Sequence, residues 1–340
     1  MQSAWVCIYI KYSSTLVIIA VYVDDLILIT ESVDELDEVK KSLETRFEMK
    51  DLGNINFCLG INITQSKNRN EIWMDQKTFI KDLLVKYELQ NAKVVSTPVD
   101  LNVKLVKDDG FSKKVDPSRY QSMVGSLLYV AIATRPDIAH AVAVVSKFSS
   151  YPTEAHLTAV KRIFRYLKGT VDLSLKYEKS EMENDLIGYS DADWAGDLDS
   201  RRSTTGNIFI LSNGAVSWSS KHQPTESLST AEAEYVALSS AAQEAIWLRR
   251  LLAELWLKEI NPTVIREDNQ GAIAIANNPV SHARTKHIDI KYHFIRDAVI
   301  NKTIVLEYCR TEDMIADILT KALCKGRFQF LRMGLGIVCK

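Results

Sequence analysis

The sequence lacks the paired cysteines of a zinc ribbon or a disulfide framework. Its five cysteines are scattered along the chain, and no CxxC spacing occurs. This distribution argues against structural disulfides and for a reducing compartment. Glycine and proline are also scarce, with 13 and 7 residues among 340. No repeat or low-complexity segment stands out, so the composition is that of an ordinary globular protein with room for two or three domains.

The sequence also has no excess of charge of one sign and no long apolar run without charged residues. The formal net charge is −1, so no overall field draws the chain to nucleic acid or to a membrane. A polyanion would therefore have to meet locally clustered charges. No signal peptide is visible. The one apolar run long enough to consider as a membrane span, residues 16–29, has two aspartates at its centre, which argues against a span.

These two aspartates, Asp24 and Asp25, lie in the most apolar stretch of the chain, "AVYVDDLILIT". Burying an unpaired carboxylate there would cost roughly several kcal/mol. β-Branched residues on both sides predict a hairpin with the pair at or beside its turn. Either the turn presents the pair to solvent, or the pair holds a metal ion.

The middle of the chain is predicted to be mostly helical. Residues 15–89 follow a β–β–α–β–β–α order, which indicates an α+β unit with antiparallel strands, and residues 96–118 have the composition of a linker. Helices are then expected through residues 119–168. The last of them carries Lys161, Arg165 and Lys168 on one face. That face indicates either a solvated surface or a surface that follows phosphates.

The final part of the chain carries four acids on different predicted elements of a mixed sheet with packed helices. They are Asp191 on the first strand, Glu234 near the start of a long helix, Asp268 at the end of a later strand and Asp317 inside the last helix. Each acid alone is more often a cap or a solvated charge. Together they suit two Mg²⁺ ions about 4 Å apart, which would activate a water in nuclease chemistry. Glu232 fits a capping box with Ser229, which leaves Glu234 facing the strand ends.

Histidines in "SHARTKHIDIKYHFIRD" could suggest zinc, but their spacings of five and six residues without nearby cysteine argue against it. They are His282, His287 and His293. With the cations around them they indicate a basic edge near phosphate or metal, where one histidine could shuttle a proton. The neighbouring cations are Arg284, Lys286, Lys291 and Arg296.

Nine stretches together resemble the C-terminal part of a copia-type LTR-retrotransposon Pol polyprotein, in family order and over nearly the whole chain. They are "VYVDDLILIT", "DLGNINFCLGINI", "MVGSLLYVAIATRPDIAHAVAVVSKF", "HLTAVKRIFRYLKGT", "GYSDADWAGDLDSRRSTTGNIFIL", "SWSSKHQPTESLSTAEAEYVAL", "EDNQGAIAIANNP", "RTKHIDIKYHFIR" and "ADILTKAL". The first resembles the YxDD signature of reverse transcriptases. A lone YVDD is a weak signal, whereas the set is highly specific.

This resemblance implies an α+β and α/β multidomain chain. A partial reverse-transcriptase palm and thumb would precede an RNase H-like mixed five-stranded sheet with helices. The expected units are the C-terminal part of the palm with its primer-positioning hairpin (1–100), a helical thumb and connection (101–183), an RNase H-like domain (184–326) and a C-terminal tail (327–340).

The resemblance also implies roles for individual residues. Asp24 and Asp25 match the metal-binding pair of the polymerase palm. The four-carboxylate set of RNase H is matched by Asp191, Glu234, Asp268 and Asp317, with Glu232 as the alternative for Glu234. The implied cofactor is Mg²⁺, two ions per nuclease site, with Mn²⁺ as a substitute. His287 and His293 match family positions of unassigned role. The expected nucleic-acid contacts are Lys161, Arg165, Lys168, Arg284, Lys286, His287 and Lys291.

The implied activity is Mg²⁺-dependent cleavage of RNA in RNA:DNA hybrids by a fragment of the polyprotein. The polymerase site is expected to be incomplete, because no Asp or Glu precedes Asp24, where the family supplies a third carboxylate. Three alternatives stay open: a non-catalytic nucleic-acid-binding remnant, a polymerase completed by a partner chain, and a domain without present function. Expected partners are RNA:DNA hybrid, template–primer, other Pol parts or a second copy, and no membrane. Family resemblance implies a cytoplasmic, virus-like-particle location.

Overall fold

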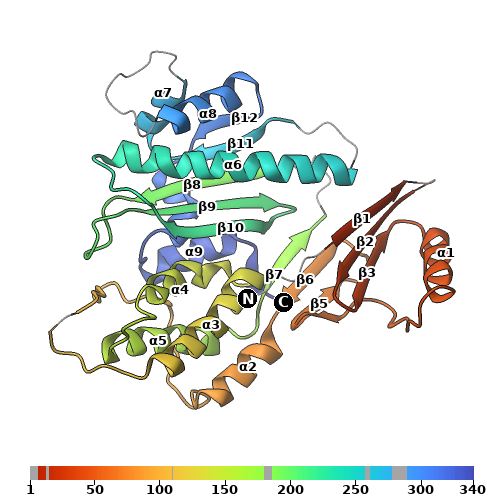
Figure 1. Ribbon diagram of the computed structural model, residues 1–340, viewed down its shortest axis with the longest axis horizontal. Coiled ribbons are helices and arrows are strands. Elements are labelled where there is room, and N and C mark those ends of the chain that lie inside the picture. Colours follow the sequence, from red (N-terminus) through yellow and green to blue (C-terminus); the bar gives the residue numbers. More distant parts are fainter. Residues whose placement is uncertain (1–6, 13–14, 109, 180–185, 257–260, 278–288) are drawn as a thin grey trace.

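The computed structural model describes the chain except for residues 1–6, 13–14, 109, 180–185, 257–260 and 278–288. The described residues form three β-sheets with helices packed around them (Figure 1). Antiparallel strands, parallel strands and helices occur together, which confirms the expected α+β and α/β class. Within the described part of the chain, no helix combines the length and apolar character needed to cross a bilayer.

The N-terminal part is a small antiparallel sheet with one helix. Its elements are β1 (Cys7–Tyr12), β2 (Leu16–Tyr22), β3 (Asp25–Thr30) and α1 (Val33–Glu44). The strands pair in the order β1–β2–β3, and α1 packs beside β3. The Ser32 hydroxyl caps α1 by accepting the N–H of Glu35 at 3.3 Å, as the sequence predicts.

The second sheet draws its strands from distant parts of the chain. They are β4 (Phe57–Cys58), β5 (Ile61–Gln65), β6 (Glu71–Asp75), β7 (Leu173–Glu178) and β13 (Ile337–Cys339). The order is β13–β7–β6–β5–β4, with every neighbour antiparallel. Because β7 pairs with both β6 and β13, this sheet joins segments that the sequence had assigned to three different units.

Residues 327–340, which we expected to form a C-terminal tail, are folded into the molecule. They complete α9 (Lys325–Gly334) and provide β13. Ile337 pairs with Leu175 of β7, and both side chains are fully buried. A three-residue strand carries too short a pattern to be predicted locally, because its formation depends on a partner far away in the sequence.

A group of helices packs below the third sheet in the view of Figure 1. They are α2 (Lys77–Lys86), α3 (Pro117–Ala133), the 3₁₀ turn η1 (Pro136–Ile138), α4 (Ala139–Ser146) and α5 (Glu154–Gly169). The predicted helical segments agree with these bounds. The Asp116 carboxylate caps α3 by accepting the N–H groups of Ser118 and Arg119 at 3.0 and 3.2 Å. Pro117 occupies the first turn, where its missing N–H costs nothing.

The third sheet is the mixed five-stranded sheet expected of an RNase H-like domain. Its strands are β8 (Ile187–Asp193), β9 (Thr204–Leu211), β10 (Gly214–His222), β11 (Thr263–Glu267) and β12 (Ile304–Tyr308). In the order β10–β9–β8–β11–β12, the first three strands are antiparallel, and β8, β11 and β12 run parallel. The remaining elements are α6 (Thr230–Trp256), α7 (Gln270–Asn277), α8 (Asp289–Ile300), η2 (Thr311–Asp313) and η3 (Ile315–Leu319).

The two faces of this sheet are covered by different layers. The long helix α6 runs along one face (Figure 1), where Leu238 and Leu248 pack with Phe209 and Ile265. The opposite face packs against η3, α9 and the helices α3 to α5 in one continuous apolar core. The strand β8 therefore lies between α6 on one face of the sheet and η3 on the other.

The last predicted helix, "TEDMIADILTKAL", consists instead of the two 3₁₀ turns η2 and η3. Met314, between them, has an extended backbone with φ −71° and ψ 98° and is fully buried. An extended residue cannot continue a helix. Burial of Met314 in the core has therefore prevailed over local helix propensity, which is a weak preference.

Candidate metal centre

Asp191 lies within β8 on the face that packs against η3. Its side chain is 1% exposed, and its Oδ2 accepts a hydrogen bond from the Thr320 hydroxyl. The residue paired with it on β9 is Gly206. A Cβ on Gly206 would lie 2.6 Å from Thr320 Cγ2 and 3.0 Å from Leu319 Cβ. The absence of a side chain at Gly206 therefore lets η3 approach the sheet closely enough to reach Asp191.

Asp317 is supplied by η3 and is also buried. Its Oδ1 lies 2.8 Å from Lys321 Nζ, and its Oδ2 lies 3.2 Å from Arg327 Nη2. Lys321 Nζ also lies 3.4 Å from Asp191 Oδ1. One ammonium group thus stands between two buried carboxylates that come from different elements.

Asp268 follows β11 directly, at the carboxyl end of a parallel strand, where α/β folds place ligands. It is half-buried, and its Oδ2 accepts a hydrogen bond of 2.9 Å from the Thr311 hydroxyl. Asp191, Asp268 and Asp317 each offer a carboxylate oxygen, and these oxygens lie within 4.8 Å of one another. The structure therefore brings three of the four predicted acids into one group.

Glu234 belongs to a second group, which shares Asp268 with the first. This group comprises Glu234 on α6, Glu267 at the end of β11 and Asp268, again with oxygens within 4.8 Å of one another. Glu234 is 7% exposed and Glu267 is fully buried. Among the described residues, the Oε2 atoms of both glutamates lack a hydrogen-bond partner. All four predicted acids are thus linked through Asp268.

Glu267 was missed in the sequence, although a signal for it exists. In β11 the side chains of Thr263, Ile265 and Glu267 are buried, and those of Val264 and Arg266 are half-buried. This alternation places Glu267 on the face of Ile265, which packs against α6. A glutamate at a core position is unusual and marks a candidate ligand.

Glu232 and Glu234 differ in what they contact. The Glu232 N–H donates to Ser229 Oγ at 3.2 Å, and Glu232 Oε2 accepts the N–H of Leu228 at 2.8 Å. These bonds cap the start of α6, as the capping-box pattern predicts. The geometry therefore favours Glu234 over Glu232 as the member of the carboxylate cluster.

The electrostatics of the cluster favour a bound cation. Burial raises the pKa of Asp191 to about 6, although the charge of Lys321 opposes this shift. Burial, and next the charge of Glu267, raise the pKa of the Glu234 carboxyl far above its usual range. Burial likewise raises the pKa of Glu267. Each shift reports that the negative form is poorly compensated, and a divalent cation would compensate it.

Asp24 lies in the turn between β2 and β3, and Asp25 is the first residue of β3. Val23 has a φ of 51° and Tyr22 pairs with Asp25, so the chain reverses beside the pair. Both carboxylates are exposed. Within the described ranges, no group of acids that could hold a metal includes them. The apolar strands therefore present the pair to solvent instead of burying it.

The predicted nucleic-acid contacts fall into three classes. Lys161 is exposed on α5. Arg165 Nε donates to the Lys93 carbonyl at 2.6 Å, and Lys168 Nζ donates to the Ala92 carbonyl at 2.8 Å. Arg165 and Lys168 therefore hydrogen-bond the backbone of residues 92–93, just before the predicted linker. Arg284, Lys286 and His287 lie outside the described residues, as does His282, and the same holds for the side chains of Lys291 and His293 in α8.

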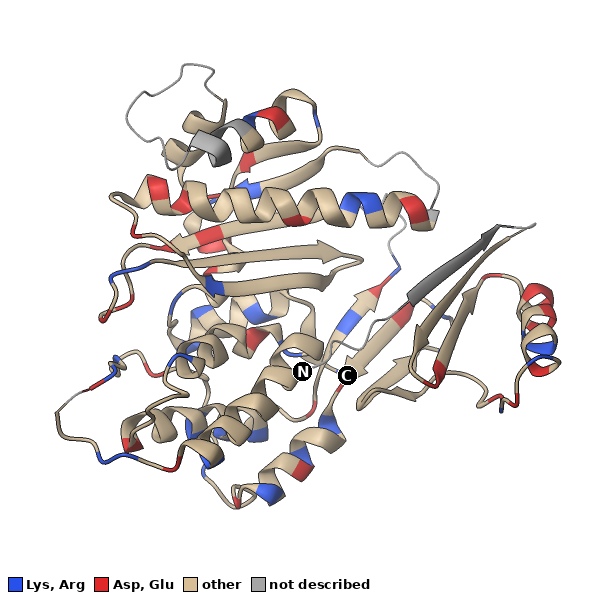
Figure 2. Cartoon of the chain, in the orientation of Figure 1, with Lys and Arg blue, Asp and Glu red and all other residues tan. Residues whose placement is uncertain are grey.

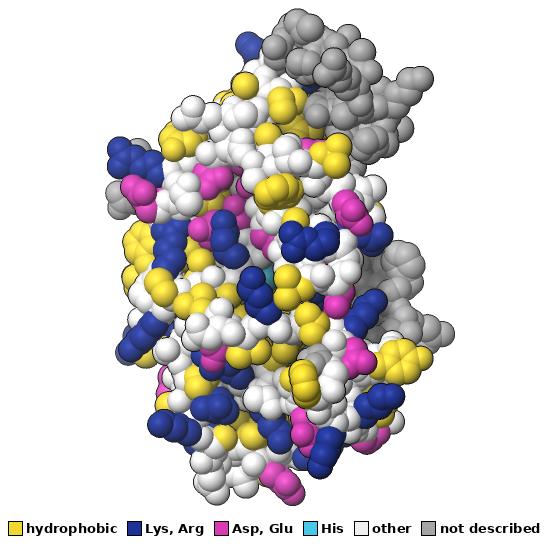
Figure 3. Space-filling model, turned by 90° about the vertical axis from the view of Figure 1, so that its left-hand side faces the viewer, with side chains coloured by type: hydrophobic (Ala, Val, Ile, Leu, Met, Phe, Trp, Pro, Cys, Tyr) yellow, Lys and Arg dark blue, Asp and Glu magenta, His cyan; other side chains and the backbone are white. Residues whose placement is uncertain are grey.

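Charged side chains are unevenly distributed over the molecule. Acidic residues gather at the start of α6 and the adjoining ends of the third sheet (Figure 2). In the space-filling view of that side, acidic side chains cluster in the upper half, with Lys and Arg side chains around and below them (Figure 3). A polyanion could therefore approach the acidic cluster along cationic surroundings.

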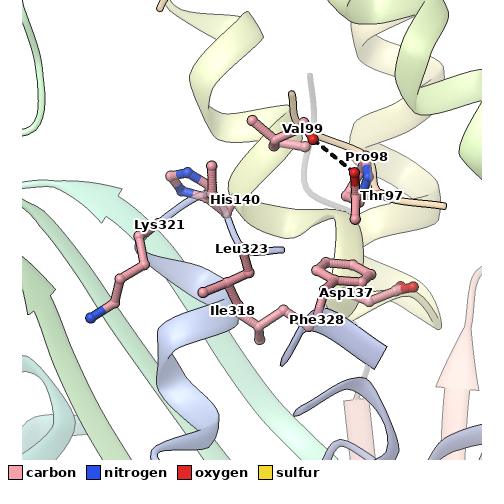
Figure 4. Close-up of a pocket in the computed structure, with 11 residues that line it drawn as sticks. Thr97, Pro98, Val99, Asp137, His140, Ile318, Lys321, Leu323 and Phe328 are labelled. Carbon is pink, nitrogen blue, oxygen red and sulfur yellow. Dashed lines mark hydrogen bonds between the residues drawn. The ribbon is translucent and has the colours of Figure 1, made fainter. Parts of the chain in front are cut away.

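A small pocket lies beside the carboxylates but does not contain them. It is formed by residues 97–99, His140, Ile318, Lys321, Leu323 and Phe328, with Asp137 among its remaining lining residues. Lys321 contributes its aliphatic stem, and its ammonium group points away from His140 (Figure 4). The dashed line in Figure 4 is the 2.9 Å hydrogen bond from the Thr97 hydroxyl to the Val99 carbonyl. The pocket therefore lies between residues 97–99 and the segment that carries Ile318 and Lys321.

Comparisons with known proteins agree with the resemblance seen in the sequence. Residues 2–101 match the family model of reverse transcriptase (RNA-dependent DNA polymerase). The retrovirus-related Pol polyprotein from transposon TNT 1-94 of Nicotiana tabacum is 40% identical over 97% of this chain, which spans 25% of that relative. The putative transposon Ty5-1 protein YCL074W of Saccharomyces cerevisiae is 35% identical, over 66% of this chain and 73% of that protein.

A solved structure of a foamy viral protease–reverse transcriptase in complex with dsDNA is similar over 86% of this chain and 55% of that one. The identity is 14% and the TM-score is 0.45.

Proposed function

Because the chain belongs to the copia-type family of retrotransposon Pol polyproteins, we propose that its RNase H-like domain cleaves the RNA strand of RNA:DNA hybrids in a Mg²⁺-dependent reaction. One observation carries the proposal: two groups of buried carboxylates share Asp268 at the edge of the third sheet. Asp191 and Asp317 complete the first group, and Glu234 belongs to the second. The products would carry 3′-hydroxyl and 5′-phosphate ends.

The donor set fits a hard divalent cation. The clustered donors are all carboxylate oxygens, which Mg²⁺ and Mn²⁺ prefer over nitrogen or sulfur. The Oε2 atom of Glu234 is buried and has no hydrogen-bond partner, so it is available to bind a cation. When bound, two such ions would activate a water and neutralise charge on the phosphodiester.

The surrounding residues hold the carboxylates in place. Thr320 donates to Asp191, Thr311 donates to Asp268, and Arg327 pairs with Asp317. Each of these three aspartates therefore has a second residue that fixes its orientation, an arrangement that typically supports metal affinity. Recognition of the hybrid would rest on minor-groove width and 2′-hydroxyl contacts.

The test is cleavage of an end-labelled RNA:DNA hybrid with Mg²⁺. We expect Asp191→Asn to lose more activity than the roughly 10–100-fold that removal of an outer partner costs. Glu232→Gln is the matched control, because it removes a nearby carboxylate charge but keeps an oxygen for the cap of α6. A folded wild-type chain that binds the hybrid without cleaving it would reject the proposal and favour a non-catalytic nucleic-acid-binding remnant.

A second candidate function rests on the exposed pair Asp24–Asp25 within the reverse-transcriptase segment. A metal site that serves a template–primer needs carboxylates accessible from solvent, and both of these carboxylates are exposed. Among the described residues no third carboxylate joins them, so another segment or chain would have to supply it. Primer extension by this chain alone would contradict that requirement.

A further inference from the structure

Glu267 lies where the fold would normally place an apolar side chain. It ends β11, two residues after Ile265, on the face that packs against α6. Strand geometry keeps it on that face, because alternate residues point the same way. The charged side chain that α6 brings within 4.8 Å of it is another acid, Glu234.

The carboxylate of Glu267 is buried without full compensation. It is 0% exposed, and its Oε1 accepts one hydrogen bond, from the N–H of Asn269 at 3.1 Å. Its Oε2 forms no hydrogen bond of normal geometry, although the neighbouring Ser190 hydroxyl interacts favourably with the carboxylate. Neither Glu267 nor Glu234 forms an ion pair with any described residue. Such an arrangement costs free energy in folding, and a buried charge of this kind normally has a partner.

We propose that Glu267 is a fifth carboxylate of the metal centre and binds, with Glu234 and Asp268, one hard divalent cation such as Mg²⁺ or Mn²⁺. This inference rests on the proposed function and extends its ligand set beyond the four acids found by resemblance. The cation supplies the positive charge that the protein does not place beside these two glutamates. The hydrogen bond from Asn269 engages Oε1 of the Glu267 carboxylate and leaves Oε2 without one.

A purely structural role for Glu267 makes a different prediction. If the side chain served only to accept the Asn269 N–H, a glutamine would fulfil the same role through its carbonyl oxygen. Glu267→Gln would then leave the response to metal unchanged. If Glu267 is a ligand, the same substitution removes a negatively charged donor from the metal-bound protein, so metal affinity falls.

The experiment measures thermal unfolding in EDTA and titration with MgCl₂ and MnCl₂ by calorimetry, on the full chain. For Glu267→Gln we expect a melting temperature in EDTA no lower than that of the wild type, because glutamine keeps the size of the side chain and places no charge in the core. We also expect metal affinity weakened about tenfold or more. Glu267→Asp, which keeps a shorter carboxylate, should recover part of the affinity. Glu232→Gln is the control for loss of one nearby negative charge and should match the wild type.

The outcomes distinguish the inference from the proposed function. If the wild type binds metal and loses binding in Asp268→Asn, yet Glu267→Gln titrates like the wild type, the ligand role of Glu267 is wrong and the nuclease proposal stands. If the wild type shows no metal binding and no cleavage, both are wrong. Weakened affinity in Glu267→Gln with an unchanged Glu232→Gln supports the fifth ligand.

Discussion

At the scale of single residues, Lys321 is the group that neutralises the cluster when no metal is bound. Burial lowers its pKa, but the charges of Asp191 and Asp317 outweigh this effect and raise it above the usual range. The lysine therefore stays protonated and stabilises two acids that would otherwise repel each other. A divalent cation at the same carboxylates would make this contribution redundant.

Replacing Lys321 with methionine should destabilise the metal-free protein more than the metal-loaded one. We expect the free energy of unfolding in EDTA to fall by about 1–2 kcal/mol, since Asp191 and Asp317 lose their counter-charge. This is less than for a fully buried pair, because the Lys321 side chain is 38% exposed. With saturating Mg²⁺ the loss should shrink. Urea unfolding in the two buffers measures both values.

A surface lysine provides the control for this comparison. Lys77 pairs with Asp172, and both side chains are largely exposed. Lys77→Met should therefore change the free energy of unfolding little, and equally with and without Mg²⁺. An equal loss for Lys321→Met in both buffers would show that its ammonium group does not substitute for a metal ion.

Residue identity alone picked out some members of the carboxylate cluster and left out another. Asp191, Asp268 and Asp317 were found because acids at strand ends and helix positions stand out from their apolar neighbours. Glu267 was missed because its significance depends on what α6 places opposite it. Arg165 was expected to face phosphate, yet it donates to a backbone carbonyl. Such a contact depends on a distant segment that sequence periodicity does not reveal.

At the scale of elements, local pattern predicted most helices and strands, because amphipathic periodicity and caps are encoded over short distances. The helices α1 and α3 and the β5–β6 hairpin are examples. The same reasoning failed for η3 and β13. The backbone of η3 is set by burial of Met314, and β13 exists only through its pairing with β7. Both depend on contacts between distant segments.

The packing of η3 on the sheet gives a prediction at this scale. Gly206→Ala would put a Cβ 2.6 Å from Thr320 Cγ2, so η3 must shift away from β9. We expect a loss of about 1–3 kcal/mol in the free energy of unfolding. Hybrid cleavage should fall as well, because η3 carries Asp317. Urea unfolding and the hybrid assay measure the two effects.

Gly326 in α9 is the matched control, because a Cβ there would meet nothing within 4 Å. Gly326→Ala should leave stability unchanged or raise it by about 0.4–1 kcal/mol, since alanine restricts the unfolded chain. If Gly206→Ala behaved like Gly326→Ala, the close approach of η3 would not be needed to build the site.

At the scale of the whole molecule, the third sheet is not separate from the helices beneath it. Tyr189, Ile208 and Ala215 of this sheet belong to the same buried cluster as the helices α3 to α5. Trp218 Nε1 donates to the Ala131 carbonyl at 2.9 Å, which ties β10 to α3. The predicted boundary at residue 184 therefore divides a continuous apolar core.

The C-terminal segment strengthens this connection. Arg332 of α9 donates to the Tyr166 hydroxyl of α5 at 3.2 Å, and β13 pairs with β7 of the second sheet. Residues 327–340, which were expected to form a tail, thus contact both the helix α5 and the second sheet. Removing it would expose apolar surface on three elements at once, and burial of such surface is the dominant favourable contribution to folding.

This continuity predicts that residues 184–326 alone do not form a stable domain. The fragment keeps α6 on one face of its sheet but leaves the opposite face, with Tyr189, Ile208 and Ala215, exposed to water. We expect a broad urea transition at a lower midpoint than in the full chain and dye binding to exposed apolar surface. A fragment of residues 113–340, which restores α3 to α5, α9 and β13, should regain a sharp transition. If residues 184–326 unfolded as sharply as the full chain and at the same midpoint, the sheet would be an independent unit, and its packing on the helices would contribute nothing to its stability.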